Sequence, residues 1–310
     1  MRGNQYNNLQ TDIKSLIEKQ DIELANKYDP DSTSKGNFLI DFAKILFDGF
    51  LIKSGIKKRL IYSSLSLEWF YKFRDYWTGE LGGRPINPHD FYFLFGIYRQ
   101  KFQAVGIDEN IEGKDFLEAW QDSRNIYSIF SQTFKFALNP LRVFRFAKYI
   151  SQNATVLEYG CGIAPLTQSL IKYYGHKRFK IHCADIPSFM FHWARWRLKD
   201  KNFVKFIKLD PDDLVPLKES HDIIFLIEVL EHLTNPLAII KHIIEKLNKN
   251  GILVFDYIKS EGEGLDTQGS VEQRLEVLRF IKDNFEILEG DIYLDGRNIG
   301  TTIVRKNASL

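Results

Sequence analysis

The 310-residue sequence contains only two cysteines, no long apolar run and almost no net charge. Cys161 and Cys183 both lie in apolar stretches, and two cysteines do not make the dense disulfide framework of a small secreted domain. This cysteine usage fits a reducing compartment, and we predict a cytoplasmic protein. The longest apolar stretches, FYFLFGIY and IIFLI, are much shorter than a membrane span, and the first ten residues lack the apolar core of a signal peptide.

Neither sign of charge is in excess, because 42 Lys and Arg stand against 40 Asp and Glu, for a net charge of +2. Proteins that bind nucleic-acid backbones irrespective of sequence carry a basic excess. The sequence therefore implies no nucleic-acid partner, although a local basic patch is left open. At this length the chain can form two domains, or one domain with a large extension.

Aromatic residues are distributed unevenly along the chain. Residues 1–150 contain 28 Phe, Tyr and Trp, whereas the remaining 160 residues contain 16. The first half has apolar residues at helical spacing, as in residues 40–55, and Gly and Pro interrupt this pattern at residues 79–88 and at Asn139–Pro140. We therefore predict a mostly helical N-terminal region over residues 1–145.

From about residue 154, short apolar runs alternate with amphipathic segments of helical length. This alternation is typical of βαβ units that build a parallel sheet. The predicted strands are residues 155–159, 179–185, 204–210, 222–229 and 251–258, with two more in the tail at 285–294 and 300–306.

The segments between these strands carry helix start and stop signals. Residues 165–175 begin with a proline and end at Gly175. Residues 235–251 have Asn235 as the N-cap and Gly251 as the expected stop. The apolar positions expected to face the core are Ile240, Ile243, Ile244 and Leu247 in that helix, and Val271, Leu275 and Leu278 in a helix of the tail.

The first predicted strand runs directly into the glycine-containing segment EYGCGIAP, residues 158–165. In an open α/β sheet, ligands bind beyond the carboxyl ends of the strands. Gly160 and Gly162 allow the backbone to approach a ligand closely, and a helix that starts at Pro165 presents free N–H groups. A dinucleotide fingerprint would need a third glycine where Pro165 stands, which disfavours a nicotinamide oxidoreductase. A purely structural turn is the alternative.

Carboxylates follow the next two predicted strands. Asp185 ends the second strand, where a carboxylate accepts hydrogen bonds from both hydroxyls of a ribose. Asp210 follows the third strand, where it is placed to accept from an exocyclic adenine amine. A helix cap for Asp185 and a solvated Asx-turn for Asp210 are the alternatives.

The fourth strand leads into HDIIFLIEVLEHLTNP, with Glu228, Glu231 and His232. In this order and spacing, the four segments resemble the class I S-adenosylmethionine-dependent methyltransferases, over roughly residues 153–258. Their first motif is an acidic residue followed by G-x-G-x-G, and here the third glycine is Ala164.

The resemblance implies an α/β fold with a Rossmann-like seven-stranded sheet in the order 3-2-1-4-5-7-6, the seventh strand antiparallel. The methyltransferase domain would span residues 146–310, and S-adenosyl-L-methionine would be the cofactor. Gly160 and Gly162 would flank its methionine part, Asp185 would hold the ribose, and Glu228 would close the pocket. The full set of implied cofactor-binding residues is Glu158, Gly160, Cys161, Gly162, Asp185, Ile186, Asp210 and Glu228.

Methyl transfer from a sulfonium requires little beyond positioning the nucleophile and removing its proton. His232 and Glu231 are the candidate catalytic residues, although a histidine there also suits packing against the next helix. Glu228, Glu231 and His232 share one face if the turn is helical, and these ligand types suit a divalent cation. Because no histidine follows His242, we predict no metal site.

Residues 192–198, HWARWRL, interleave Trp193 and Trp196 with Arg195 and Arg197. Such residues are able to stack a base or bind a phosphate. Because the two tryptophans are three residues apart, we interpret the segment as a helix with one buried face and solvated arginines.

The most probable activity from these patterns is methyl transfer to a hydroxyl oxygen of a small molecule or glycan. An N-methyltransferase, or a methyltransferase fold retained as a binding module, is the alternative. The aromatic N-terminal region would serve as a lid over the acceptor or as an oligomerisation surface, for example of a homodimer.

Overall fold

The computed structural model describes residues 68–83, 85–86, 91, 94–95, 126–137, 145–210, 213–215, 217–259 and 266–307. Seven strands form one sheet in the order β3-β2-β1-β4-β5-β7-β6. The strands are β1 Thr155–Tyr159, β2 Lys180–Asp185, β3 Val204–Lys208, β4 His221–Leu226, β5 Leu247–Tyr257, β6 Phe285–Glu289 and β7 Ile299–Lys306. Neighbours among β1 to β5 are parallel, whereas β7 is antiparallel to both β5 and β6. The predicted fold class and strand order are confirmed.

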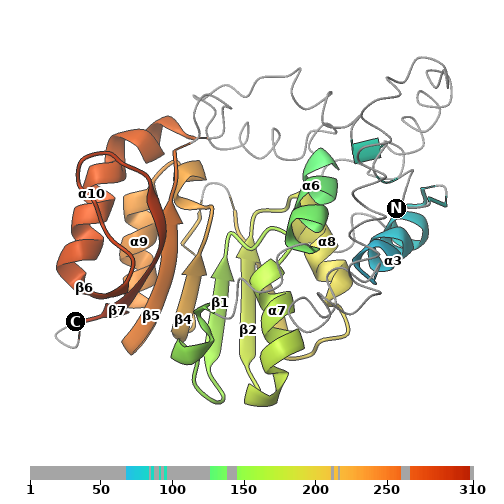
Figure 1. Ribbon diagram of the computed structural model, residues 1–310, viewed down its shortest axis with the longest axis horizontal. Coiled ribbons are helices and arrows are strands. Elements are labelled where there is room, and N and C mark those ends of the chain that lie inside the picture. Colours follow the sequence, from blue (N-terminus) through green and yellow to red (C-terminus); the bar gives the residue numbers. More distant parts are fainter. Residues whose placement is uncertain are drawn as a thin grey trace, which may run out of the picture.

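Helices cover both faces of this sheet (Figure 1). The α-helices are α3 Glu68–Asp75, α6 Ile126–Ala137, α7 Pro165–Tyr174, α8 Phe189–Arg197, α9 Pro236–Glu245 and α10 Gln268–Asn284. Short π- or 3₁₀-helical turns are η1 Tyr76–Glu80, η4 Ala147–Tyr149, η5 Gly175–Lys177 and η6 Leu230–His232. In the described part of the chain, no helix combines the length and apolar character that a membrane span needs.

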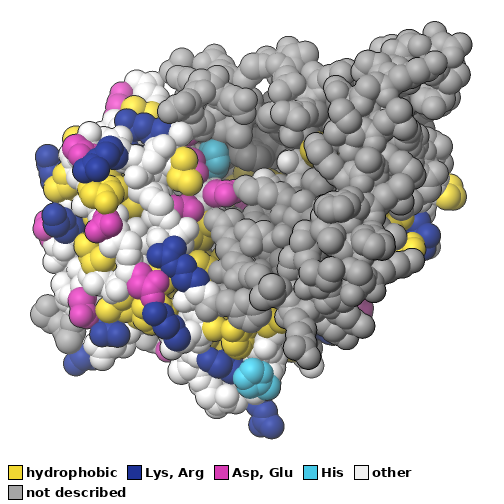
Figure 2. Space-filling view, in the orientation of Figure 1, with side chains coloured by type: hydrophobic (Ala, Val, Ile, Leu, Met, Phe, Trp, Pro, Cys, Tyr) yellow, Lys and Arg dark blue, Asp and Glu magenta, His cyan; other side chains and the backbone are white. Residues whose placement is uncertain are grey.

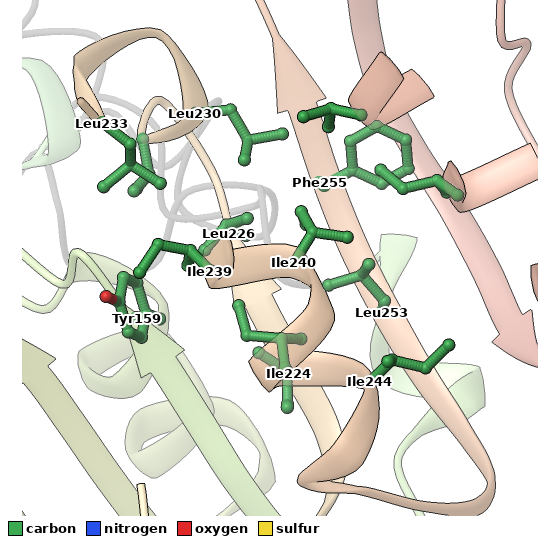
Figure 3. Close-up of a cluster of buried hydrophobic side chains, with 14 of the residues drawn as sticks. Tyr159, Ile224, Leu226, Leu230, Leu233, Ile239, Ile240, Ile244, Leu253 and Phe255 are labelled. Carbon is green, nitrogen blue, oxygen red and sulfur yellow. The ribbon is translucent and has the colours of Figure 1, made fainter. Parts of the chain in front are cut away.

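One face of the sheet is covered by α9 and α10. Ile239, Ile240 and Ile244 of α9 lie against Ile224 of β4 and Leu253 of β5 (Figure 3). The side chain of Asn235 accepts a hydrogen bond from the Ala238 N–H, which caps the helix ahead of its buried isoleucines. The other face is covered by η4, α7 and α8, with Leu166, Leu170, Phe191 and Leu198 in its core.

The C-terminal limit of α9 differs from the prediction. The helix ends at Glu245, and Leu247 opens β5 by pairing with His221. The His221 N–H donates to the Lys246 carbonyl at 2.8 Å, so pairing with β4 stops the helix before Gly251. A Cβ on Gly251 would lie 2.7 Å from Leu247 Cγ, so close packing is the reason for this glycine.

The buried face of α10 also differs from the prediction. Val271 and Leu275 are exposed, and the buried face carries Arg274, Val277, Leu278 and Ile281. Arg274 is buried because its guanidinium donates to the carbonyls of Tyr257 and Arg297. An apolar count therefore misplaced this face, since a charged residue occupies it.

Strand limits also differ from the prediction at three sites near the edge of the sheet. β3 ends at Lys208 and β4 at Leu226, so Asp210 and Glu228 lie in loops. β6 ends at Glu289, five residues early, because Gly290 takes φ +87° and a Cβ there would lie 2.7 Å from Thr302 Oγ1.

The N-terminal region is helical wherever it is described. Residues 68–80 form α3 and η1, and these pack with α6 around an aromatic cluster that contains Phe73, Trp77 and Phe130. The predicted helix at 40–55 and break at Asn139–Pro140 lie outside the described residues. On the surface formed by α10, β6 and β7, Lys and Arg are interspersed with Asp and Glu (Figure 2).

Candidate functional site

The loop after β1 combines three residues in the left-handed region. Gly160 has φ +63°, Gly162 +50° and Ala164 +54°. A Cβ on Gly160 would lie 2.4 Å from Val229 Cγ2, whereas a Cβ on Gly162 would meet Met190 Sδ only at 3.7 Å. Gly160 is therefore required by both space and conformation, and Gly162 by conformation.

Two charged side chains hold this loop from behind. The Glu158 carboxylate accepts from the N–H groups of Leu166 and Thr167 at 3.1 and 2.9 Å, in the first turn of α7. Arg197 of α8 donates through Nη2 to the carbonyls of Ile163 and Ala164. Burial raises the pKa of Glu158 and lowers the pKa of Arg197 to about 10, and each charge opposes the other's shift. The expectation of solvated arginines in this segment is wrong for Arg197, because these carbonyls bind it.

Asp185 joins the end of β2 to the same loop. Its Oδ2 accepts from the Gly162 N–H at 2.5 Å, and its Oδ1 accepts from the Ile186 N–H at 2.8 Å. Burial raises the pKa of Asp185 to about 7, and the two hydrogen bonds oppose that rise. Each carboxylate oxygen retains a lone pair for a further donor.

Two cavities lie on either side of the loop and share several lining residues. The first, which we call the α7 cavity, extends toward the start of α7; the second, the β2 cavity, extends toward the end of β2. The α7 cavity is lined by Gln132, Glu158, Tyr159, Gly160, Cys161, Gly162, Ile163, Pro165, Leu166, Met190, Phe225, Ile227 and Glu228. The β2 cavity is lined by Tyr159, Gly160, Gly162, Asp185, Ile186, Ser188, Met190, Leu209, Leu214, Glu228, Val229, His232 and Leu233.

Glu228 lies where the two cavities meet, in an unusual backbone conformation. Its φ is +56°, which a non-glycine residue adopts only when neighbours hold it there. The Glu228 N–H donates to Oδ1 of the buried Asp256 of β5 at 2.6 Å. This bond fixes the chain just beyond β4, beside both cavities.

The structure brings most of the predicted residues to these cavities. Gly160, Gly162 and Glu228 line both, while His232 lines the β2 cavity beside Asp185 and Ile186. Glu158 and Cys161 line the α7 cavity, although the Glu158 carboxylate is engaged by α7 and the Cys161 N–H by the Ala184 carbonyl. These positions place the expected residues without testing their roles.

Two predicted residues lie elsewhere. Asp210 is exposed and lines neither of the two cavities, where Leu209 and Leu214 take its place. Glu231 is 5% exposed and also lines neither cavity. Burial raises the pKa of Glu231 to about 8, and nearby Asp256, Glu228 and Asp266 raise it further. In the described residues, no group of three His, Cys, Asp or Glu side chains is arranged to hold a metal ion.

Comparison with known families identifies this arrangement. A family model described as a methyltransferase domain matches residues 131–286, about half of the chain. The chain belongs to the methyltransferase family. The matched segment begins within α6, ahead of the predicted domain boundary at residue 146, and that boundary stays a prediction.

Solved structures with a similar fold include other methyltransferases. TehB from Haemophilus influenzae has a TM-score of 0.43 and 20% identity over 58% of this chain and 66% of its own. A SAM dependent methyltransferase from Aquifex aeolicus gives 0.42 and 19% over 55% and 90%. Magnesium protoporphyrin IX methyltransferase from Synechocystis PCC 6803, with bound SAM, gives 0.39 and 14% over 69% and 97%.

These similarities identify no acceptor for the methyltransferase described here. No curated protein matches the chain. This chain spans 66% of the length of TehB, slightly under two thirds.

S-adenosylmethionine is the methyl donor of this family, as predicted, and the residues present fit it. Gly160 and Gly162 leave room for a ligand between the cavities, and the half-buried Asp185 carboxylate stands where ribose hydroxyls can donate to it. Ile186, Leu209 and Leu214 supply apolar walls suited to a purine.

Some residues of the site were missed in the sequence. Gln132 and Met190 enter the cavities from α6 and α8, which no motif marks. Asp256 and Arg197 act through backbone groups, so their side-chain type alone gives no signal. Leu214 carried a weak signal, because it is apolar within an acidic loop, and its carbonyl accepts from the Tyr159 hydroxyl at 2.5 Å.

Proposed function

We propose that this methyltransferase binds the nucleoside part of S-adenosylmethionine in the β2 cavity and its amino-acid part in the α7 cavity. The bound sulfonium supplies a methyl group already activated for displacement. The supporting observation is that Gly160 and Gly162 line both cavities while Asp185 lines the first of them, so one elongated ligand can contact all three.

Asp185 would bind the ribose through the lone pairs that Gly162 and Ile186 leave available. Ile186 and Leu209 would enclose the adenine. Glu158 would act indirectly, because its carboxylate holds α7 and thereby the shape of the loop. Asp210 has no part in this proposal.

The acceptor we propose is a hydroxyl of a small molecule or glycan. His232 is the cavity-lining group suited to remove the hydroxyl proton, since a neutral imidazole is an effective base near pH 7. Glu231 is not assigned this role, because it is buried and its raised pKa keeps it protonated at pH 7. An amine acceptor is the second candidate, favoured by the carboxylate of Glu228 beside both cavities.

We further propose that residues 1–145 contribute the acceptor-facing wall. The described helices of this region support the proposal, because α3, η1 and α6 pack against α8 beside the cofactor loop. The proposed cytoplasmic location rests on cysteine usage and composition alone.

Isothermal titration of the purified chain with S-adenosylhomocysteine, and separately with NADH, tests the proposed cofactor. We expect clear binding of the sulfur nucleoside and none of NADH. A methyl-transfer assay on hydroxyl- and amine-bearing acceptors then separates the two acceptor classes, and His232→Gln should reduce only hydroxyl methylation while leaving nucleoside affinity unchanged. Absence of S-adenosylhomocysteine binding would remove the proposal.

A further inference from the structure

Gln132 of α6 is a cavity residue that the cofactor motifs do not include. It lines the α7 cavity together with Glu158, Gly160 and Glu228. Its Oε1 is buried and accepts no hydrogen bond from any described residue. A buried acceptor without a partner is unfavourable, so an oxygen placed at a cavity wall is suited to a donor from a ligand.

Neighbouring aromatic residues hold Gln132 in this position. Phe130, two residues earlier, is fully buried, and its ring lies 4.8 Å from that of Phe73 and 5.0 Å from that of Phe91. Thr133, the next residue, is 5% exposed. Ile163 of the cofactor loop belongs to the same aromatic cluster as Phe130. Packing therefore fixes α6 relative to the loop, and Gln132 faces a preformed cavity.

The chemistry of the α7 cavity favours a cationic donor. Its lining contains two carboxylates, Glu158 and Glu228, and no lysine or arginine. Both Glu158 oxygens already accept hydrogen bonds from the first turn of α7. Gln132 Oε1 and the Glu228 side chain are thus the remaining acceptors for an ammonium group, which carries three donors and no acceptor.

We propose that Gln132 binds the α-ammonium group at the amino-acid end of S-adenosylmethionine. The proposal rests on the cofactor orientation given above. It makes α6, which precedes the sheet in the chain, a part of the cofactor site. The N-terminal region then contributes to donor binding as well as to the acceptor side.

Two ligands separate this role from a general effect on the fold. S-adenosylhomocysteine carries the amino-acid part, whereas 5′-methylthioadenosine has the same nucleoside and lacks that part. Titration calorimetry on the full chain should show that Gln132→Leu weakens S-adenosylhomocysteine binding by about tenfold or more, the loss of one charge-assisted hydrogen bond. The affinity for 5′-methylthioadenosine should stay unchanged.

Two further variants serve as controls. Gln132→Glu keeps an acceptor oxygen and should retain S-adenosylhomocysteine affinity within about threefold. Ser131→Ala, on the same helix and outside the lining of both cavities, should bind both ligands as the wild type does. Equal binding of S-adenosylhomocysteine by Gln132→Leu and wild type, or an equal loss for both ligands, would overturn the role of Gln132. If the wild type binds neither ligand, the proposed function itself fails.

Discussion

Asp185 accepts a hydrogen bond of 2.5 Å from the backbone N–H of Gly162, and this bond ties the end of β2 to the loop after β1. The same carboxylate lines the β2 cavity. Asp185 therefore both shapes the loop and faces the proposed ribose position.

The raised pKa of Asp185, about 7, predicts a pH-dependent affinity for S-adenosylhomocysteine. Ribose hydroxyls donate to the ionised carboxylate, so protonation below pH 7 removes acceptor capacity. We expect affinity at pH 6 to be about tenfold weaker than at pH 8, which calorimetry across this range measures. Asp185→Asn should bind more weakly and show a flat profile. An equally steep profile in Asp185→Asn would assign the titration to another group.

The two loop glycines should tolerate alanine differently. Gly162→Ala adds a Cβ with ordinary contacts, so only its left-handed backbone opposes the change, by about 1–2 kcal/mol of unfolding free energy. Gly160→Ala should lower the free energy of unfolding further, because its Cβ would lie 2.4 Å from Val229 Cγ2.

Denaturant unfolding measures both losses. In a Val229→Ala background the clash is removed, and Gly160→Ala should then cost about as much as Gly162→Ala. An undiminished loss in that background would show that Val229 is not the obstacle.

Tyr76 connects the N-terminal helices to the cofactor domain. Its hydroxyl lies 2.6 Å from Nδ1 of His192 on α8, and both residues are fully buried. Tyr76→Phe should therefore lower the free energy of unfolding by on the order of 1–2 kcal/mol, as measured by denaturant titration. Tyr71→Phe is the matched control, because Tyr71 lies on α3 with 48% exposure and should change stability little. Equal effects of the two variants would argue against the Tyr76–His192 bond.

Glu231 should make stability depend on pH in the alkaline direction. Its pKa is about 8 in the folded chain and near 4.5 when unfolded, so the folded state holds a proton that the unfolded state releases. This contribution is complete below pH 4.5 and is lost as the pH rises through 8. Glu231→Gln should consequently gain on the order of 1–3 kcal/mol relative to wild type between pH 5 and pH 9.

Thermal or denaturant unfolding at the two pH values measures this gain. Glu276→Gln, at an exposed position of α10, should show no such difference between the two values. A gain for Glu231→Gln that is equal at both values would contradict the assigned titration.

The sheet was predictable from the sequence because its strands are short apolar runs with clear breaks. β1 and β2 match their predicted residues almost to the position, and the strand order follows from the motifs of the family. Helix limits were less predictable, since the end of α9 depends on the pairing of Leu247 with His221, which are distant in sequence.

The candidate site was predictable where a residue type has a local reason. Gly160 and Asp185 stand at the ends of adjacent strands, and parallel strands bring such ends together. Gln132 and Asp256 were not predictable, because their positions depend on packing between segments far apart in the chain. Asp210 illustrates the opposite error, since β3 ends at Lys208 and leaves it exposed.

The most direct test of the ribose role is the affinity of S-adenosylhomocysteine for Asp185→Ala and Asp210→Ala, measured by calorimetry against wild type at pH 8. Both variants remove an aspartate just beyond a parallel strand, but only Asp185 lines a cavity. We predict that Asp185→Ala loses most of the affinity and that Asp210→Ala binds as the wild type does. Unchanged affinity in Asp185→Ala would contradict the placement of the nucleoside in the β2 cavity.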